Sequence, residues 1–133
     1  MVLNNNERYH FGKDQKLKSR KLLQKLFAEG KHVNAHPLKA IWLLENDTRF
    51  FQAGVSVSSR HFKKAVDRNL IKRLMREALR FQKNELEHLL TEREKQLSLF
   101  LIYTGKDLPE YKLIFDNCAV ILKKLIKTVN ASH

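Results

Sequence analysis

The sequence predicts a single α+β domain in which a mixed sheet of about four strands packs with helices. Three observations support this prediction: helical periodicity in three segments, a period of two in the middle of the chain, and no repeat or linker that would divide the 133 residues. The expected order is helix, two or three strands, helix, strand, helix. A chain of this length has room for one domain with its own core, so we expect residues 1–133 to fold as one unit.

The first helix is expected at residues 19–29, because four apolar side chains recur there at helical spacing. They are Leu22, Leu23, Leu26 and Phe27. Ser19 is a candidate N-cap, and Gly30 is a candidate residue just past the helix end. Residues 1–12 form a polar stretch that predicts a flexible tail, and we expect a second flexible end at residues 130–133.

Strands are expected in three segments. Residues 38–44, directly after Pro37, form an apolar run that ends in a polar turn. Residues 51–58 alternate with a period of two, so one face is apolar and the other is small and polar. The apolar face carries Phe51, Ala53, Val55 and Val57, and the polar face carries Gln52, Gly54, Ser56 and Ser58. Residues 97–103 are typical of a buried strand, and residues 111–129 return to helical spacing.

One long helix is expected at about residues 62–90, with two contrasting faces. The arc expected to pack on the core contains Val66, Leu70, Ile71, Leu74, Met75, Ala78 and Phe81. The opposite arc carries Arg68, Lys72, Arg76 and Arg80 at successive steps of four, with Asn69, Arg73 and Lys83 beside them. Like charges at this spacing destabilise an isolated helix, and a merely solvated face usually mixes both signs. The basic arc therefore favours contact with phosphate groups, which Arg and Lys both bind.

The charge of the chain points to an anionic partner. Lys and Arg number 26 against 14 Asp and Glu, a net charge of +12. Residues 7–31 hold eight basic and three acidic side chains, a net +5, and residues 60–83 hold nine basic and two acidic ones, a net +7. Nucleic acid is the commonest partner of such a chain, and an anionic membrane surface is the second. A membrane-surface helix would leave its apolar face free, whereas the core needs that face here.

Other functional classes find little support in the sequence. It contains no apolar run long enough to span a membrane, and residues 1–6 lack the basic and apolar regions of a signal peptide. Cys118 is the only cysteine, so neither an internal disulfide nor a thiolate zinc site is expected. These features together predict a cytoplasmic protein.

Residues 56–78, SVSSRHFKKAVDRNLIKRLMREA, resemble the signature of the bacterial ribonuclease P protein family. That signature joins a strand ending in V-S to a basic turn and then to A-V-x-R-N-x-x-K-R-x-x-R-E on a helix. Its members here are Val57, Ser58, Ala65, Val66, Arg68, Asn69, Lys72, Arg73, Arg76 and Glu77. Residues 16–30 also resemble the family's first helix, so the resemblance covers about two-thirds of the chain.

The resemblance implies a protein that binds RNA and does not itself cut it. In the family, an RNA subunit hydrolyses precursor tRNA at its 5′ end with Mg²⁺, so Mg²⁺ is expected through the RNA subunit, and no catalytic or metal-binding residue is expected on this chain. The partners implied are ribonuclease P RNA and precursor tRNA, with no membrane and no obligatory protein partner. The residues expected to contact the RNA subunit are Arg60, Lys63, Lys64, Arg68, Asn69, Lys72, Arg73, Arg76 and Arg80.

A cleft between the sheet and the first helix is expected, by resemblance, to hold the single-stranded 5′ leader of the precursor tRNA. The small polar strand face suits an extended backbone that passes close by, and aromatic rings provide stacking surface in single-strand binders. The residues expected at this site are Lys16, Lys18, Arg20, Lys25, Phe27, Trp42, Gln52, Ser56 and Ser58. For Phe27 and Trp42, a place in the core is an equally good interpretation of the sequence.

Two positions depart from the family pattern. Leu70 stands where the family usually has a second arginine, so a contact to RNA or to a metal ion is expected to be missing. Leu23 stands where the family often has an aromatic residue, which predicts weaker leader contacts, although Phe27 keeps its aromatic side chain. The resemblance also implies a left-handed strand–helix–strand crossover, against the general right-handed rule.

Two other functions compete with this interpretation. A protein nuclease would need converging carboxylates or a histidine pair, but Glu85, Glu87, Glu92 and Glu94 crowd one helix end, where a solvated surface is the simpler interpretation. His32 and His36 are four residues apart in a segment expected to be extended, so they should not share a helical face. A ribosomal or other structural RNA-binding protein would show the same basic faces, and only the motif separates it from a ribonuclease P subunit. A helix-turn-helix would need a second short helix, which residues 59–63 do not provide.

Overall fold

The computed structural model describes residues 20–46 and 51–131, which form four helices and four strands in these ranges. In chain order they are α2 (Arg20–Glu29), β2 (Lys31–Ala35), β3 (Leu38–Glu45), β4 (Phe51–Val57), α3 (Ala65–Gln82), α4 (Asn84–Arg93), β5 (Gln96–Tyr103) and α5 (Tyr111–Ala131). This arrangement confirms the predicted single α+β domain with a mixed four-stranded sheet. The expected N-cap Ser19 and the expected tail at residues 1–12 lie outside the described residues.

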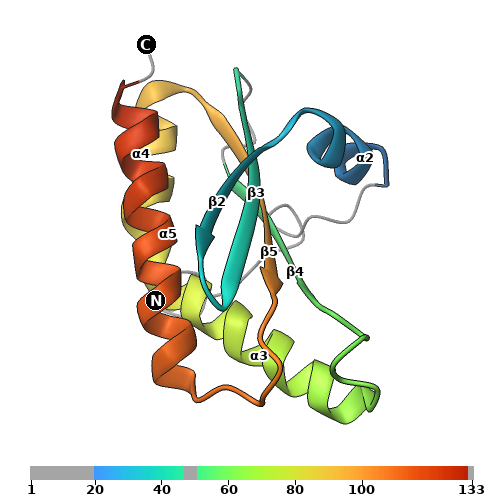
Figure 1. Cartoon of the computed structure of the whole chain (residues 1–133). Helices are drawn as coiled ribbons and strands as arrows, with labels where there is room; N and C mark the ends of the chain where they lie inside the picture. Colours follow the sequence, from blue (N-terminus) through green and yellow to red (C-terminus); the bar gives the residue numbers. More distant parts are fainter. Residues whose placement is uncertain (1–19, 47–50, 132–133) are drawn as a thin grey trace, which may run out of the picture.

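The sheet has the order β2-β3-β5-β4, with β5 in an interior position. β3 runs antiparallel to both β2 and β5, whereas β4 and β5 are parallel. Parallel neighbours cannot be joined by a hairpin and need a crossover. Helices α3 and α4 provide this crossover, and α5 follows β5 and runs alongside α4 (Figure 1).

The main core lies between one face of the sheet and helices α3, α4 and α5. Alternate residues of β5, namely Leu97, Leu99 and Leu101, point into this core, which follows from the period of two along a strand. Trp42 lies on the same face. The α5 residues in this core are Ile114, Cys118, Ile121, Leu122, Leu125 and Val129, which match the helical spacing predicted from sequence.

Helix α2 packs on the opposite face of the sheet and builds a second, smaller core. Leu26 and Ile41 are its fully buried members, and Phe100 and Ile102 of β5 pack against them. The helix has only 10 residues, so it covers part of that face. The remainder of the face is where the candidate binding surface described below is found.

The structure corrects two predicted boundaries and the predicted place of one lysine. The expected single helix at residues 62–90 is divided at Lys83 into α3 and α4, which run in different directions (Figure 1). No proline or glycine marks this break, so the periodicity alone did not reveal it. Lys83 was expected in the basic arc, but its side chain is buried and its Nζ donates to Glu87 Oε1 at 2.8 Å. At the other end of the chain, α5 continues through Ala131, so residues 130 and 131 belong to a helix.

None of the helices in the described ranges combines the length and the apolar character that a membrane span requires.

The only cysteine provides a test of the core. Burial in the contact between α5 and the sheet raises the pKa of the Cys118 thiol from 9.0 to about 12. The unfolded chain therefore loses the thiol proton above pH 9 while the folded chain keeps it, so the free energy of unfolding should fall as pH rises. Between pH 8 and pH 10 the expected loss is about 1.4 kcal/mol. Urea unfolding at both pH values measures it, and Cys118→Ala should lack this component; an equal pH dependence in both proteins would contradict the assignment.

Candidate nucleic-acid interface

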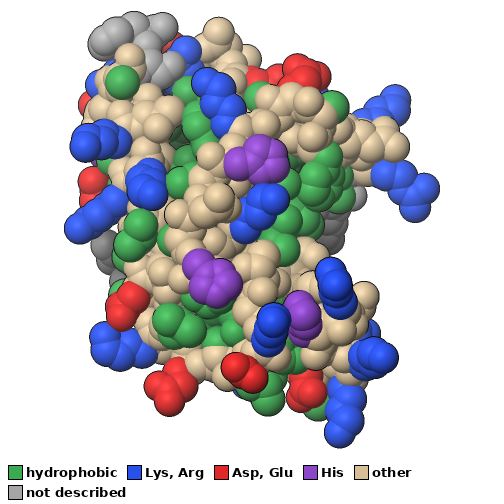
Figure 2. Space-filling view, viewed as in Figure 1, with side chains coloured by type: hydrophobic (Ala, Val, Ile, Leu, Met, Phe, Trp, Pro, Cys, Tyr) green, Lys and Arg blue, Asp and Glu red, His purple; other side chains and the backbone are tan. Residues whose placement is uncertain are grey.

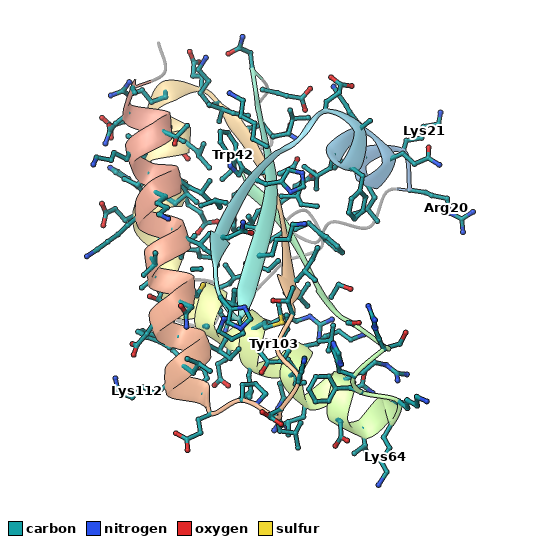
Figure 3. The ribbon with its side chains drawn as sticks, viewed as in Figure 1. Arg20, Lys21, Trp42, Lys64, Tyr103 and Lys112 are labelled. Carbon is teal, nitrogen blue, oxygen red and sulfur yellow. The ribbon has the colours of Figure 1, made fainter. Side chains whose placement is uncertain are left out.

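A basic surface covers the loop at residues 58–64 and much of α3. Every residue predicted to contact an RNA subunit lies on this loop or this helix. The exposed members are Arg60, Lys63, Lys64, Asn69, Arg73 and Arg76, and the half-buried ones are Arg68, Lys72 and Arg80. Figure 2 shows Lys and Arg side chains projecting at the end of the molecule where α3 begins, and Lys64 points away from the domain there (Figure 3). We call this set the loop–α3 surface.

The buried side of α3 differs from the predicted apolar arc. The helix buries Ile71, Met75, Ala78 and Leu79, which recur at steps of four, seven and eight residues. By contrast, Val66 is 75% exposed, Leu70 37% and Phe81 47%, so their predicted place in the core is wrong. Helix α3 packs mainly against α5 and β4, and these neighbours cover a side narrower than half the helix circumference.

Two members of the loop–α3 surface interact within the chain. Arg68 Nη1 donates to the backbone oxygens of Phe62 and Lys63, each at 2.8 Å. Arg80 lies 3.6 Å from a carboxylate oxygen of Glu77, and its guanidinium lies 5.2 Å from the ring centroid of Phe81. These two arginines are therefore less available to phosphates than the exposed cations around them.

A second surface lies on the sheet face that α2 leaves uncovered. The strand register places Gly54 beside Phe100 and Ser56 beside Ile102, and Ile102 in turn pairs with Lys39. The Phe27 ring, 54% exposed, meets the Phe100 ring edge-on at a centroid distance of 5.5 Å. We call this set, Phe27, Lys39, Gly54, Ser56, Phe100 and Ile102, the sheet surface. It combines an aromatic pair and a lysine with small strand residues, and aromatic rings beside positive charge are features of single-strand binding faces.

Some residues predicted for this surface lie elsewhere. Trp42 is 9% exposed and belongs to the main core on the other side of the sheet, so its ring cannot stack together with Phe27 on one ligand. Of the two interpretations that the sequence left open for Trp42, the core position is the one observed, and the sequence could not decide because β3 has apolar residues on both faces. Gln52 is on the expected face but only 6% exposed, and Ser58 Oγ accepts a hydrogen bond from the Arg60 amide in the basic loop.

The lysines and arginines predicted for the leader have different environments. Lys16 and Lys18 lie outside the described residues. Arg20 and Lys21 project from the start of α2 (Figure 3). Lys25 forms an ion pair with Glu45, and this hydrogen bond, with the attraction of the carboxylate, raises the pKa of Lys25 above its ordinary value. Lys25 is therefore charged but already has a partner on β3.

Sequence reasoning missed Phe100 and Lys39 as members of the sheet surface. A signal for Phe100 was present: if Leu97, Leu99 and Leu101 point to the main core, Phe100 must face the other way. Lys39 alternates in the same manner with Leu38 and Ala40, which are buried in the main core. Only the pairing of β3 with β5 brings Lys39 beside Ile102.

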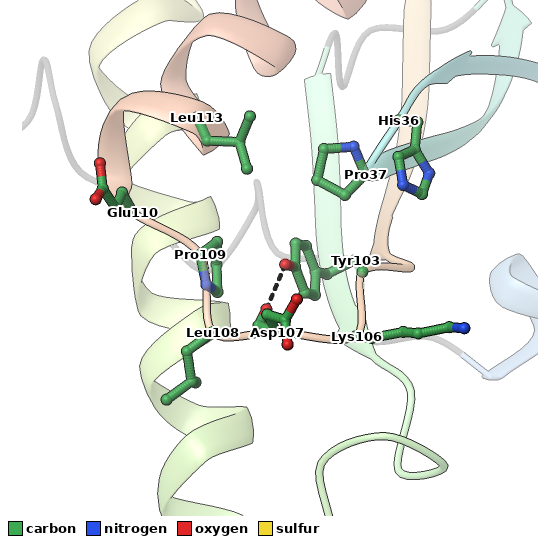
Figure 4. Close-up of a pocket in the computed structure, with 10 residues that line it drawn as sticks. His36, Pro37, Tyr103, Lys106, Asp107, Leu108, Pro109, Glu110 and Leu113 are labelled. Carbon is green, nitrogen blue, oxygen red and sulfur yellow. Dashed lines mark hydrogen bonds between the residues drawn. The ribbon is translucent and has the colours of Figure 1, made fainter.

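A pocket of about 490 Å³ lies between the turn at His36 and Pro37 and the loop that leads into α5. Tyr103 Oη donates to the Asp107 backbone oxygen at 2.6 Å across it, and Lys106 and His36 lie on one side of this loop while Glu110 lies on the other (Figure 4). Its lining carries charges of both signs, with Lys106 next to Asp107 and Glu110 further along the loop. No group of three or more potential metal ligands occurs within residues 20–46 and 51–131.

The fold and the two surfaces define a small, strongly basic α+β protein with the features of a nucleic-acid-binding domain. Comparison with known sequences gives the family: a model described as Ribonuclease P matches residues 11–126, so the chain belongs to the ribonuclease P protein family. A "Ribonuclease P protein component" from Porphyromonas gingivalis is 31% identical over 108 residues, covering 80% of this chain and 79% of that protein. The component from Streptococcus agalactiae is 40% identical over 75 residues, covering 56% of this chain and 67% of that protein.

Solved structures support the same fold. The RNase P protein from Thermotoga maritima superposes with a TM-score of 0.66 at 20% identity, covering 82% of this chain and 96% of that one. The Staphylococcus aureus RNase P protein gives a TM-score of 0.64 at 21% identity, covering 84% of this chain and 94% of that one. At these identities the likeness concerns the fold alone.

The position of α2 on the sheet provides a test. A Cβ added at Gly30 would stand 2.3 Å from the Leu26 backbone oxygen and 2.7 Å from Ile41 Cγ2, so β3 and α2 would have to move apart. We expect Gly30→Ala to lower the free energy of unfolding by about 1–3 kcal/mol, the usual cost of overpacking. Exposed Glu29→Ala is the control and should change it by less than about 0.5 kcal/mol. Urea denaturation measures both, and equal stability of the two variants would refute the close packing at Gly30.

Proposed function

We propose that this chain is the protein subunit of ribonuclease P. It binds the catalytic RNA through the loop–α3 surface and holds the 5′ leader of precursor tRNA on the sheet surface, and so promotes 5′ maturation of tRNA. The observation that carries the proposal is the continuity of the two surfaces. β4, which carries Gly54 and Ser56, runs directly into the basic loop at residues 58–64.

The loop–α3 surface supports RNA binding through its charge and its lack of acids. Residues 60–83 contain only Asp67 and Glu77 against nine Lys and Arg. Each phosphate contact releases bound counterions from the RNA, so such a surface contributes affinity without reading sequence. The ribonuclease P relatives share this region of the chain, since the family match spans residues 11–126.

The sheet surface supports binding of an unpaired strand. The rings of Phe27 and Phe100 offer apolar surface on which a base can stack, and each stacked base contributes about 1–3 kcal/mol in proteins of this kind. Gly54 and Ser56 are small, so a nucleic-acid backbone can approach β4 closely. Lys39, half-buried on the same face, places a positive charge near the phosphates of such a strand.

In this proposal the chemistry belongs to the RNA subunit, and Mg²⁺ acts there. The protein contributes binding and orientation: its cations offset repulsion between the two RNAs, and its sheet surface fixes the leader. Of the carboxylates outside the two surfaces, Glu87 is paired with the buried Lys83, and Glu92 lies 3.6 Å from His88 on the exposed side of α4.

The experiment is cleavage of a precursor tRNA at low Mg²⁺ with a bacterial ribonuclease P RNA, in the presence and absence of this chain. We expect cleavage to require the RNA and to accelerate when the protein is added. If the protein alone cleaves, catalysis by the RNA subunit is refuted. If the protein changes nothing and does not bind the RNA, a ribosomal or other structural RNA-binding role replaces the proposal.

Two variants assign the surfaces. Arg76→Ala removes an exposed cation of the loop–α3 surface and should weaken binding to the RNA subunit by roughly fivefold, with a salt slope lower by about one. Lys124→Ala removes the same charge from the exposed side of α5 and should leave both quantities unchanged.

Phe27→Ala should weaken binding of a precursor tRNA with a leader by about tenfold and leave binding of mature tRNA unaltered. An equal loss of affinity for both tRNAs would contradict the binding of the leader to the sheet surface.

A further inference from the structure

Arg68 occupies a position where a cation is electrostatically unfavourable. It lies in the first turn of α3, where the helix dipole places partial positive charge, and Lys63 and Lys64 precede it closely. The residue at the N-cap position, Lys64, makes no side-chain capping hydrogen bond. The start of α3 therefore lacks the usual side-chain link between a helix and the segment that precedes it.

The guanidinium of Arg68 provides such a link in the opposite sense: a side chain of the helix donates to the backbone of the preceding loop. Its Nη1 donates to two consecutive backbone oxygens of the preceding loop, those of Phe62 and Lys63, both at 2.8 Å. Hydrogen bonds from a charged donor are stronger than neutral ones, and the planar guanidinium fixes their directions.

Two further contacts fix the loop. The Phe62 side chain is buried, with its ring centroid 6.0 Å from that of Tyr103, and Ser58 Oγ accepts a hydrogen bond from the Arg60 amide at 3.2 Å. Around these anchors the side chains of Arg60, His61, Lys63 and Lys64 are exposed. The backbone of the loop is thus anchored to the domain, while its basic side chains are exposed to solvent.

We propose that Arg68 is a positioning residue: it holds the loop at residues 58–64 so that Arg60, Lys63 and Lys64 meet the RNA backbone together. This role rests on the proposed function and is an alternative to the prediction that Arg68 itself contacts RNA. Both N–H groups of Nη1 are directed at the loop carbonyls. Cations held in their bound arrangement bind more tightly, because less conformational freedom is lost on association.

The first arm of the test uses the free protein and hydrogen exchange of the amides at residues 59–64. Arg68→Ala and Arg68→Lys should both increase exchange there, by about tenfold for alanine, because the two carbonyl bonds are lost or weakened. Arg76→Ala removes the same charge from the same helix and should leave exchange at these amides unchanged. Circular dichroism and the melting temperature establish that all three variants are folded. Wild-type exchange in both Arg68 variants would overturn the proposal.

The second arm measures binding to ribonuclease P RNA over a range of salt concentrations. Arg68→Lys keeps the charge, so a role through phosphate contact predicts nearly wild-type affinity and an unchanged salt slope. Positioning predicts the opposite: Arg68→Lys binds at least about fivefold more weakly, with a slope lower by one or more, because the loop cations no longer act together. Faster exchange with unchanged RNA binding would also overturn the proposal. If even the wild-type chain fails to bind this RNA, the proposed function fails, while the exchange arm still decides whether Arg68 holds the loop.

Discussion

The alternation of side chains along β5 is the constraint on which the rest of the structure depends. This strand pairs with β3 on one side and β4 on the other, so its residues must serve both faces of the sheet. Leu97, Leu99 and Leu101 enter the main core, while Phe100 and Ile102 face α2. A shift of one residue in register would exchange the two sets and move every apolar contact to the wrong face. Both cores, and the sheet surface beside the smaller one, depend on the alternation along this one strand.

The unequal covering of the two faces creates the binding geometry. Three helices close one face, whereas the short α2 covers only part of the other, which leaves Phe27 and Phe100 accessible at its edge. The parallel pairing of β4 with β5 then demands a crossover. That crossover begins with the basic loop and α3, so the chain passes directly from the polar strand face to its most basic segment. The proximity of the two surfaces is therefore a consequence of topology.

A count of charges overstates the number of cations that an anionic partner can meet. Lys83 is buried beside Glu87, and Lys25 is paired with Glu45. Arg68 binds the backbone of the basic loop, and Arg80 lies against Glu77 and Phe81. Burying or pairing a cation costs desolvation, which the partner must offset. The chain thus uses part of its positive charge to shape the surface that presents the remainder.

The sequence by itself determined the fold class, the order of the elements, the basic segment and the alternation along β4, because each of these depends on spacing between neighbouring residues. It did not determine which side of α3 is buried, since Val66, Leu70 and Phe81 have the hydrophobicity of core residues and are nevertheless exposed. Nor did it decide between core and ligand contact for Trp42, find the break at Lys83, or bring Lys39 and Phe100 to the sheet surface. Those features are decided by which faces meet across the sheet, and such contacts join residues far apart in the chain, where local periodicity carries no information.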